Sequence, residues 1–182
     1  MPAMVVAGML VVLIQNPAQT FTASSSPVSD TLREYAARHG KNLVASAELL
    51  PAEKYSYHPT PAQMTFGQLV VHIVQTNVAL CSTISDAAPP MTPDELQKIA
   101  KVEEKTPLVA AMRRSFEYCT QALAKADDAH LADQASMFGK PLPMSRAAVL
   151  IALAADWADH YSTAASYLRL NGLLPPTAQP KQ

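Results

Sequence analysis

The chain has 182 residues, enough for one domain with a sizeable hydrophobic core. Its formal net charge is −1, and lysine and arginine are scattered rather than gathered in a basic stripe, which argues against a nucleic-acid partner. Only 16% of the residues are charged and 49% are hydrophobic, while 15 prolines stand against 5 glycines. This composition is typical of amphipathic helices separated by proline-rich connections.

The N-terminal segment differs from the rest of the chain. Residues 1–29 carry no charged side chain and contain the continuous apolar run Val5–Ile14. Such a run is far shorter than the ~20 residues that cross a bilayer, but its length suits the apolar part of a secretory signal peptide. We therefore expect a signal peptide at residues 1–23, cleaved between Ala18 and Ser26, and a periplasmic or secreted protein with no membrane attachment. No basic residue precedes the run, and a buried N-terminal helix is the alternative interpretation.

Two long helices are predicted in the first half. The first is expected from Asp30 to Leu50 with Ser29 as its N-cap, because apolar residues recur there at helical spacing. A proline-rich connection follows. The second helix is expected to start at Thr65, whose spacing to Gln68 fits a capping box, and to end at about Ser85.

Three further helices are predicted in the second half. A short one opens at Thr92 and reaches about Ala100, and a long one has Thr106 as N-cap, Pro107 in its first position and its end at about Ala126. The last is capped by Ser145 and ends at the pair Asn171-Gly172, with the intervening residues 127–143 expected as a loop.

The pattern predicts an all-α fold. Four long amphipathic helices without any alternating strand pattern indicate a four-helix bundle. We place this domain at residues 28–177, with a disordered tail at residues 178–182.

Two polar residues lie on the core face of the last helix. Asp156 and His160 are four residues apart, so they share one face with Val149, Leu153, Thr163 and Tyr167. A buried polar group without a partner costs about 1–3 kcal/mol. Either a hydrogen bond between the two residues or a metal ion would satisfy them.

His72 is the third candidate residue. It falls in the phase of Leu69 and Thr76 on the second helix, where it is either a satisfied core histidine or a ligand. If this face meets the last helix, then His72, Asp156 and His160 converge in the bundle core, a usual place for metal sites. Two imidazoles and one carboxylate leave coordination positions open and suit divalent Zn, Ni, Fe or Mn.

The chain has two cysteines, Cys81 and Cys119, both on predicted helices. In an oxidising compartment they would form a disulfide if those helices are neighbours, and otherwise they are small core residues. We favour the disulfide.

Two long motifs carry a resemblance to a known family. The stretch Leu49–His72 and the stretch His160-Tyr161 followed by Tyr167–Pro176 resemble the DinB-like family of bacterial four-helix bundles. In that family three histidines usually bind a divalent metal, one on the second helix and two in a His-x-x-x-His on the last. His72 matches the first and His160 the third, whereas Asp156 occupies the second position.

The resemblance implies a limited range of functions. Some relatives are metal-dependent thiol transferases or isomerases, and many others have no known activity. We expect an exported protein that binds a divalent metal through His72, Asp156 and His160 and acts by hydrolysis or transfer on a small molecule. The alternative is a non-catalytic or structural bundle without metal. Such bundles often form homodimers.

The remaining polar residues near these positions have plainer interpretations. Asp159 points away from the predicted site, and Tyr167 is interpreted as a core residue. The other three histidines are expected at the surface: His39, His58 and His130.

Overall fold

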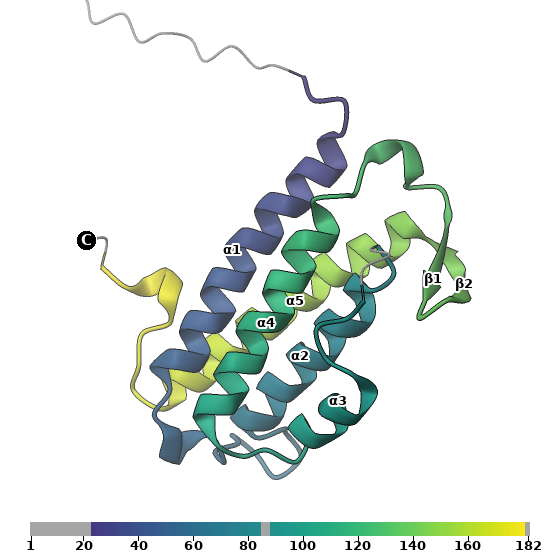
Figure 1. Cartoon of the computed structure of the whole chain (residues 1–182). Helices are drawn as coiled ribbons and strands as arrows, with labels where there is room; N and C mark the ends of the chain where they lie inside the picture. The colour runs from purple at the N-terminus through teal and green to yellow at the C-terminus, as the bar shows by residue number, and fades with distance from the viewer. Residues whose placement is uncertain (1–22, 85–87, 181–182) are drawn as a thin grey trace, which may run out of the picture.

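The structure is a computed structural model that describes residues 23–84 and 88–180 (Figure 1). Four long helices form a bundle: α1 (Pro27–Leu49), α2 (Phe66–Cys81), α4 (Lys105–Leu123) and α5 (Arg146–Leu170). A short helix, α3 (Pro93–Ile99), and a hairpin of β1 (Gln134–Met137) and β2 (Lys140–Ser145) lie in the connections. The predicted bundle is confirmed, and residues 1–22 of the predicted signal peptide lie outside the described residues.

The order of the helices around the bundle decides which residues meet. Helix α1 packs against α4 and α5, and α2 packs against the same two helices, so α1 and α2 occupy opposite corners. In Figure 1, α1 and α5 run in one direction and α2 and α4 in the other. Helices α2 and α4 are therefore parallel neighbours, while α2 and α5 are antiparallel neighbours.

The core is filled by the apolar faces of the four long helices. Its largest fully buried side chains include Trp157 of α5 and Phe66 of α2. Helices α1 and α4 approach closely at Gly40, where a Cβ atom would lie 3.0 Å from Cδ1 of Phe116. None of the described helices combines the length and the apolar character needed to cross a membrane.

Most predicted helix starts are confirmed. Thr65 and Gln68 form a capping box, as do Thr92 and Glu95, and the Ser145 hydroxyl accepts a hydrogen bond from the Ala148 N–H. Gly172 has the positive φ of 75° expected just after a helix end.

Two predicted N-caps are wrong. Helix α1 begins earlier, at Pro27 after Ser26, so Ser29 lies in its first turn, and α4 begins at Lys105 after Glu104 rather than after Thr106. Two helices are also shorter than predicted: α2 ends at Cys81 rather than at about Ser85, and α4 ends at Leu123 rather than at about Ala126.

The error at Ser29 has a tertiary cause, since charged side chains join the ends of α1 and α4. The Asp128 carboxylate, just beyond α4, accepts hydrogen bonds from the N–H groups of Val28 (3.0 Å) and Ser29 (2.9 Å). Arg33 of α1 donates to the carbonyls of Leu123 (2.9 Å) and Ala126 (3.0 Å) at the end of α4. Lys105 of α4 donates to the Leu50 carbonyl (2.8 Å) at the end of α1. Each helix thus satisfies backbone groups that the other helix leaves free.

The β1–β2 hairpin contradicts the expected loop and the expected absence of strands. Met137 pairs with Lys140, so the loop consists of Phe138 (φ 51°) and Gly139 (φ 77°). Two central residues with positive φ are typical of a type I′ turn, whose usual sequence is Asn-Gly. The residue pair Phe-Gly lacks that signal, and two prolines in β2 obscure the strand pattern.

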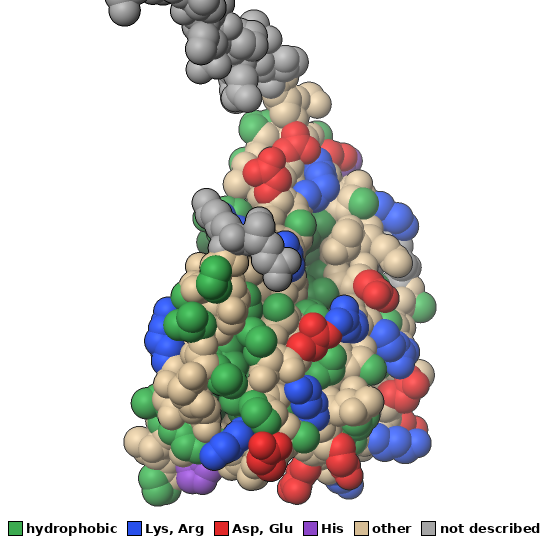
Figure 2. Space-filling model, turned by 90° about the vertical axis from the view of Figure 1, so that its left-hand side faces the viewer, with side chains coloured by type: hydrophobic (Ala, Val, Ile, Leu, Met, Phe, Trp, Pro, Cys, Tyr) green, Lys and Arg blue, Asp and Glu red, His purple; other side chains and the backbone are tan. Residues whose placement is uncertain are grey.

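Figure 2 shows the surface on the side of α1. Charged side chains of both signs intermix on its right half, whereas hydrophobic side chains gather on its left half. Lysine and arginine are interspersed with acidic residues on this face, in agreement with the scattered charges of the sequence.

Candidate metal centre

The antiparallel packing of α2 and α5 brings the three predicted residues together. One possible ligand atom from each of His72, Asp156 and His160 lies within 4.8 Å of the other two. The two imidazole rings are 4.7 Å apart between centroids and tilted by 37°. All three side chains are half-buried rather than deeply buried, so the cluster lies at the edge of the α2–α5 interface.

The ring of His160 is oriented by its own helix. Its Nδ1 atom lies 2.6 Å from the backbone carbonyl oxygen of Asp156 and 3.4 Å from Oδ1 of the same residue. A proton on Nδ1 that is donated to this carbonyl leaves the lone pair on Nε2. Metal-binding histidines commonly have this arrangement, in which a backbone carbonyl fixes the tautomer and the ring orientation.

Asp156 is not fully satisfied by its neighbours. Its side chain is only 19% exposed, and its Oδ2 atom is buried without a hydrogen-bond partner. Burial raises the pKa of Asp156, and the nearby imidazoles of His160 and His72 act in the opposite direction. The contact with His160 therefore leaves one carboxylate oxygen unpaired.

The donor set fits a divalent cation. The cluster supplies two imidazole nitrogens and one carboxylate oxygen, which together bind Zn, Ni, Fe(II) or Mn. A cation between them would also satisfy the unpaired Oδ2 atom of Asp156. Three protein ligands leave at least one coordination position for water or another molecule.

A cavity of about 630 Å³ adjoins the cluster on the α2 side. Its wall includes His72, the polar residues Ser56 and Thr65 from the connection before α2, and Lys101 and Glu103 from the connection between α3 and α4. Of the three candidate ligands, His72 lines this cavity, so a small molecule inside it would lie beside the His72 side chain.

The other residues named from the sequence lie outside the three-residue cluster. Asp159 is exposed, as predicted, and Tyr167 is buried in the core with its hydroxyl donating to the Met64 carbonyl at 2.6 Å. His58 and His130 are exposed, as predicted.

The surface prediction for His39 is wrong. This residue is only 8% exposed and lies near the rings of Tyr35 and Tyr161, with centroid distances of 5.5 and 6.4 Å. Its spacing from Ala36 and Leu43 on the buried face of α1 is the signal that would have found it.

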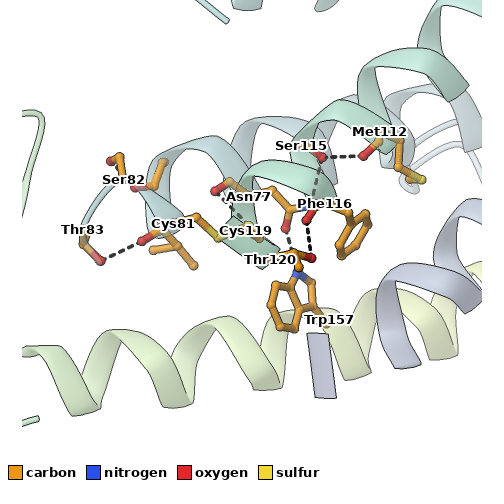
Figure 3. The surroundings of a disulfide bond; sticks show 12 residues. Asn77, Cys81, Ser82, Thr83, Met112, Ser115, Phe116, Cys119, Thr120 and Trp157 are labelled. Carbon is orange, nitrogen blue, oxygen red and sulfur yellow. Dashed lines mark hydrogen bonds between the residues drawn. A yellow bond between two sulfur atoms is a disulfide. The ribbon is translucent and has the colours of Figure 1, made fainter. Parts of the chain in front are cut away.

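Sequence reasoning missed Asn77, a fully buried residue of α2 (Figure 3). Its Nδ2 atom donates to the Ser115 hydroxyl on α4 (3.0 Å), and its Oδ1 atom accepts from Trp157 Nε1 on α5 (2.6 Å). Asn77 follows Ile73 and Val74 at helical spacing, and an amide in that apolar phase was the available signal.

The predicted disulfide between Cys81 and Cys119 is confirmed. The two Cα atoms lie 5.2 Å apart, and both cysteines of the chain are used. The bond joins α2 to α4 next to Asn77 (Figure 3).

Comparisons with known proteins agree with this architecture. A family model described as the DinB superfamily matches residues 35–164. Among solved structures, a DinB-like protein from Bacillus cereus has 18% sequence identity and a TM-score of 0.62, with 81% of this chain and 95% of that chain covered. A protein from Exiguobacterium sibiricum assigned to the DinB family has 20% identity and a TM-score of 0.58, with 79% and 91% covered.

A third solved structure, a conserved protein from Enterococcus faecalis, has 17% identity and a TM-score of 0.61, with 79% and 96% covered. At these identities the solved structures establish the fold alone. No curated protein matches the chain.

Proposed function

Because the chain belongs to the DinB superfamily, we propose that it binds a divalent metal ion through His72, Asp156 and His160. One observation carries the proposal: a buried carboxylate oxygen of Asp156 has no partner although two imidazoles lie beside it. A cation is the group that satisfies both kinds of donor at once. The carboxylate in place of the family's usual second histidine favours a hard or borderline cation.

The proposal extends to chemistry on a small molecule. When bound, a divalent metal lowers the pKa of a coordinated water or thiol and polarises an electrophile. The side chains contribute orientation: the Asp156 carbonyl fixes the ring of His160, and His72 faces the adjoining cavity, which is large enough for a small substrate. Hydrolysis or transfer is the reaction class that these features support.

Export is the second part of the proposal. The Cys81–Cys119 disulfide is the kind of bond that persists in oxidising compartments, and the apolar run Val5–Ile14 suits a signal peptide. A periplasmic or secreted location favours hydrolysis over transfer to a low-molecular-weight thiol, because such thiols are mainly cytosolic cofactors.

Two alternatives predict different metal contents. A non-catalytic binding protein retains the metal without turning over a substrate, and a structural bundle holds no metal. In the structural case, Asp156 and His160 satisfy each other through the 3.4 Å contact, at the cost of one unpaired oxygen.

Elemental analysis of the protein purified without an affinity tag tests the proposal. We expect one divalent ion per chain, and its loss in His160→Ala and Asp156→Ala. Asp159→Ala is the matched control, since this carboxylate adjoins the cluster in sequence but is exposed. Absence of stoichiometric metal, together with no thermal stabilisation by added Zn²⁺, Ni²⁺ or Mn²⁺, would contradict it.

A further inference from the structure

Helices α2 and α4 are joined by two successive cross-links. The Cys81–Cys119 disulfide and the Asn77–Ser115 hydrogen bond both connect residues 38 positions apart. A constant separation is the signature of two parallel helices in one register. The two cross-links are therefore one helical turn apart, and the disulfide keeps Asn77 and Ser115 in position for their hydrogen bond.

Asn77 also fixes how α2 is aligned with α5 along their length. In an antiparallel pair of helices, the residue numbers of successive partners increase along one helix and decrease along the other. Asn77 pairs with Trp157, and His72, five residues earlier, lies against His160, three residues later. The hydrogen bond and the imidazole pair are thus successive contacts of one interface.

Trp157 connects this interface to the candidate ligands. Its side chain is fully buried, and it directly follows Asp156 in α5. Its Nε1–H group donates to Asn77 Oδ1 at 2.6 Å, while its ring packs against Phe116 of α4 at a centroid distance of 5.8 Å. A shift of α5 against α2 would break this bond and separate Asp156 and His160 from His72.

We propose that Asn77, Trp157 and the Cys81–Cys119 disulfide are positioning groups for the metal site, so that metal affinity depends on whether the disulfide is formed. The inference rests on the proposed metal binding. The disulfide fixes α2 against α4. Asn77 of α2 bonds to both α4 and α5, and its bond to Trp157 fixes the separation between His72 and the two ligands on α5. Groups that orient the ligands typically change metal affinity by about 10-fold to 100-fold when removed.

The disulfide state supplies a chemical switch. Reduction by an external dithiol breaks the S–S bond, adds two electrons and two protons to give two thiols, and oxidises the dithiol to its own disulfide. Both sulfurs are buried, so the double variant Cys81→Ala/Cys119→Ala is the cleaner way to remove the bond.

The test measures Zn²⁺ affinity by competition with a chromophoric chelator. Trp157→Phe removes the N–H donor but keeps an aromatic ring, and Cys81→Ala/Cys119→Ala removes the disulfide. For each we expect the Zn²⁺ dissociation constant to rise about tenfold or more. Leu43→Ala is the control for general loss of stability, since Leu43 is a buried residue of α1 that takes no part in these bonds. Its dissociation constant should not change at a temperature where it is folded.

A second readout does not require metal. Trp157 is the single tryptophan of the chain, so emission excited at wavelengths where the six tyrosines do not absorb reports its surroundings alone. Loss of the disulfide should shift the emission of apo protein in the same direction as Asn77→Ala, whereas Leu43→Ala should not.

The outcomes separate the two proposals. Zn²⁺ binding that is equally tight in the unmutated protein, in Trp157→Phe and in the double cysteine variant would overturn the positioning role and leave the metal site intact. A tenfold weakening in Leu43→Ala as well would overturn it too, because the effect would then be one of stability. Absence of binding in the unmutated protein would overturn the metal site and this inference with it.

Discussion

The α1–α4 pair and the α2–α5 pair are held together in different ways. At the ends of α1 and α4, charged side chains bind free backbone groups: Arg33, Lys105 and Asp128. The contact between α2 and α5 instead contains a buried amide–indole hydrogen bond and all three candidate ligands. The charged side chains at the periphery satisfy backbone groups of solvent-exposed helix ends. The buried Asn77–Trp157 hydrogen bond instead fixes the alignment of α2 with α5 in the core.

The difference teaches where this fold tolerates change. A charge lost from the periphery is replaced by water, which hydrogen-bonds the freed backbone groups. A polar group lost from the core leaves its partner unsatisfied where water does not reach. We therefore expect mutations in the network of Asn77, Trp157 and the disulfide to have larger effects than mutations of the helix-end charges.

Removal of the disulfide should have the largest effect. For a loop of 38 residues the chain-entropy model gives a loss of about 3–4 kcal/mol in the free energy of unfolding. Urea unfolding of Cys81→Ala/Cys119→Ala, followed by circular dichroism, measures this loss. A loss below about 1 kcal/mol would contradict the chain-entropy value for this loop and the rank of the disulfide as the largest effect.

Removal of the Asn77 side-chain amide should follow. Asn77→Leu leaves the buried Trp157 Nε1 group without its acceptor, whereas the Ser115 hydroxyl still donates to the Met112 carbonyl, so the free energy of unfolding should fall by about 1–3 kcal/mol. A double-mutant cycle with Trp157→Phe should show strong coupling, because both residues belong to one hydrogen bond. Additive effects in this cycle would be inconsistent with the network.

The helix-end cations should contribute less. Arg33→Met and Lys105→Met should each cost about 0.3–1 kcal/mol, and the loss should shrink at high salt because exposed charges are screened. The two effects should add, since the residues cap opposite ends of the helix pair. If Arg33 and Lys105 were coupled as strongly as we expect for Asn77 and Trp157, the α1–α4 and α2–α5 pairs would not differ in how they are held together.

The smallest effect at neutral pH is expected for Asp128→Asn, because an amide oxygen still accepts from α1. Partial burial would raise the pKa of Asp128, but hydrogen bonds from Val28 and Ser29 outweigh it and lower the pKa below its ordinary value. A carboxylate with a lowered pKa stabilises the folded state above its ordinary pKa and loses this contribution as the pH falls through the lowered value.

Thermal melts across acidic pH measure that contribution. Below about pH 4 the unmutated protein should lose stability more steeply than Asp128→Asn. Parallel melting curves for the two proteins across this range would show that the Asp128 carboxylate contributes no special stabilisation to α1.

Much of the architecture follows from local patterns. Helical spacing and the capping signals at Thr65, Thr92 and Ser145 predicted the bundle, and the cysteine spacing allowed the disulfide. The start of α1 was missed because its satisfying group, Asp128, lies 99 positions from Ser29 in the chain. The hairpin was missed because Phe138 occupies a left-handed position that usually selects asparagine or glycine.

The candidate site divides in the same way. The four-residue spacing of Asp156 and His160 is local, so their shared face was predictable. His72 was found from its phase on the second helix, and the family resemblance matched it to a ligand position. The role of Asn77 depends on which helices are neighbours, because its partners Ser115 and Trp157 come from two other helices. Metal binding, action on a small molecule and a homodimer stay predictions, each with its own measurement: elemental analysis, a substrate screen and analytical ultracentrifugation.

The absent side chain of Gly40 has a consequence beyond the α1–α4 contact. A Cβ atom at residue 40 would lie 3.0 Å from Cδ1 of Phe116, and the ring centroid of Phe116 lies 5.8 Å from that of Trp157. One added methyl group on α1 would therefore require Phe116 to shift, and this ring packs beside the indole of Trp157, which directly follows Asp156 in the chain. A substitution on α1, a helix that contributes none of the candidate ligands, would in this way reach the part of the core next to Asp156.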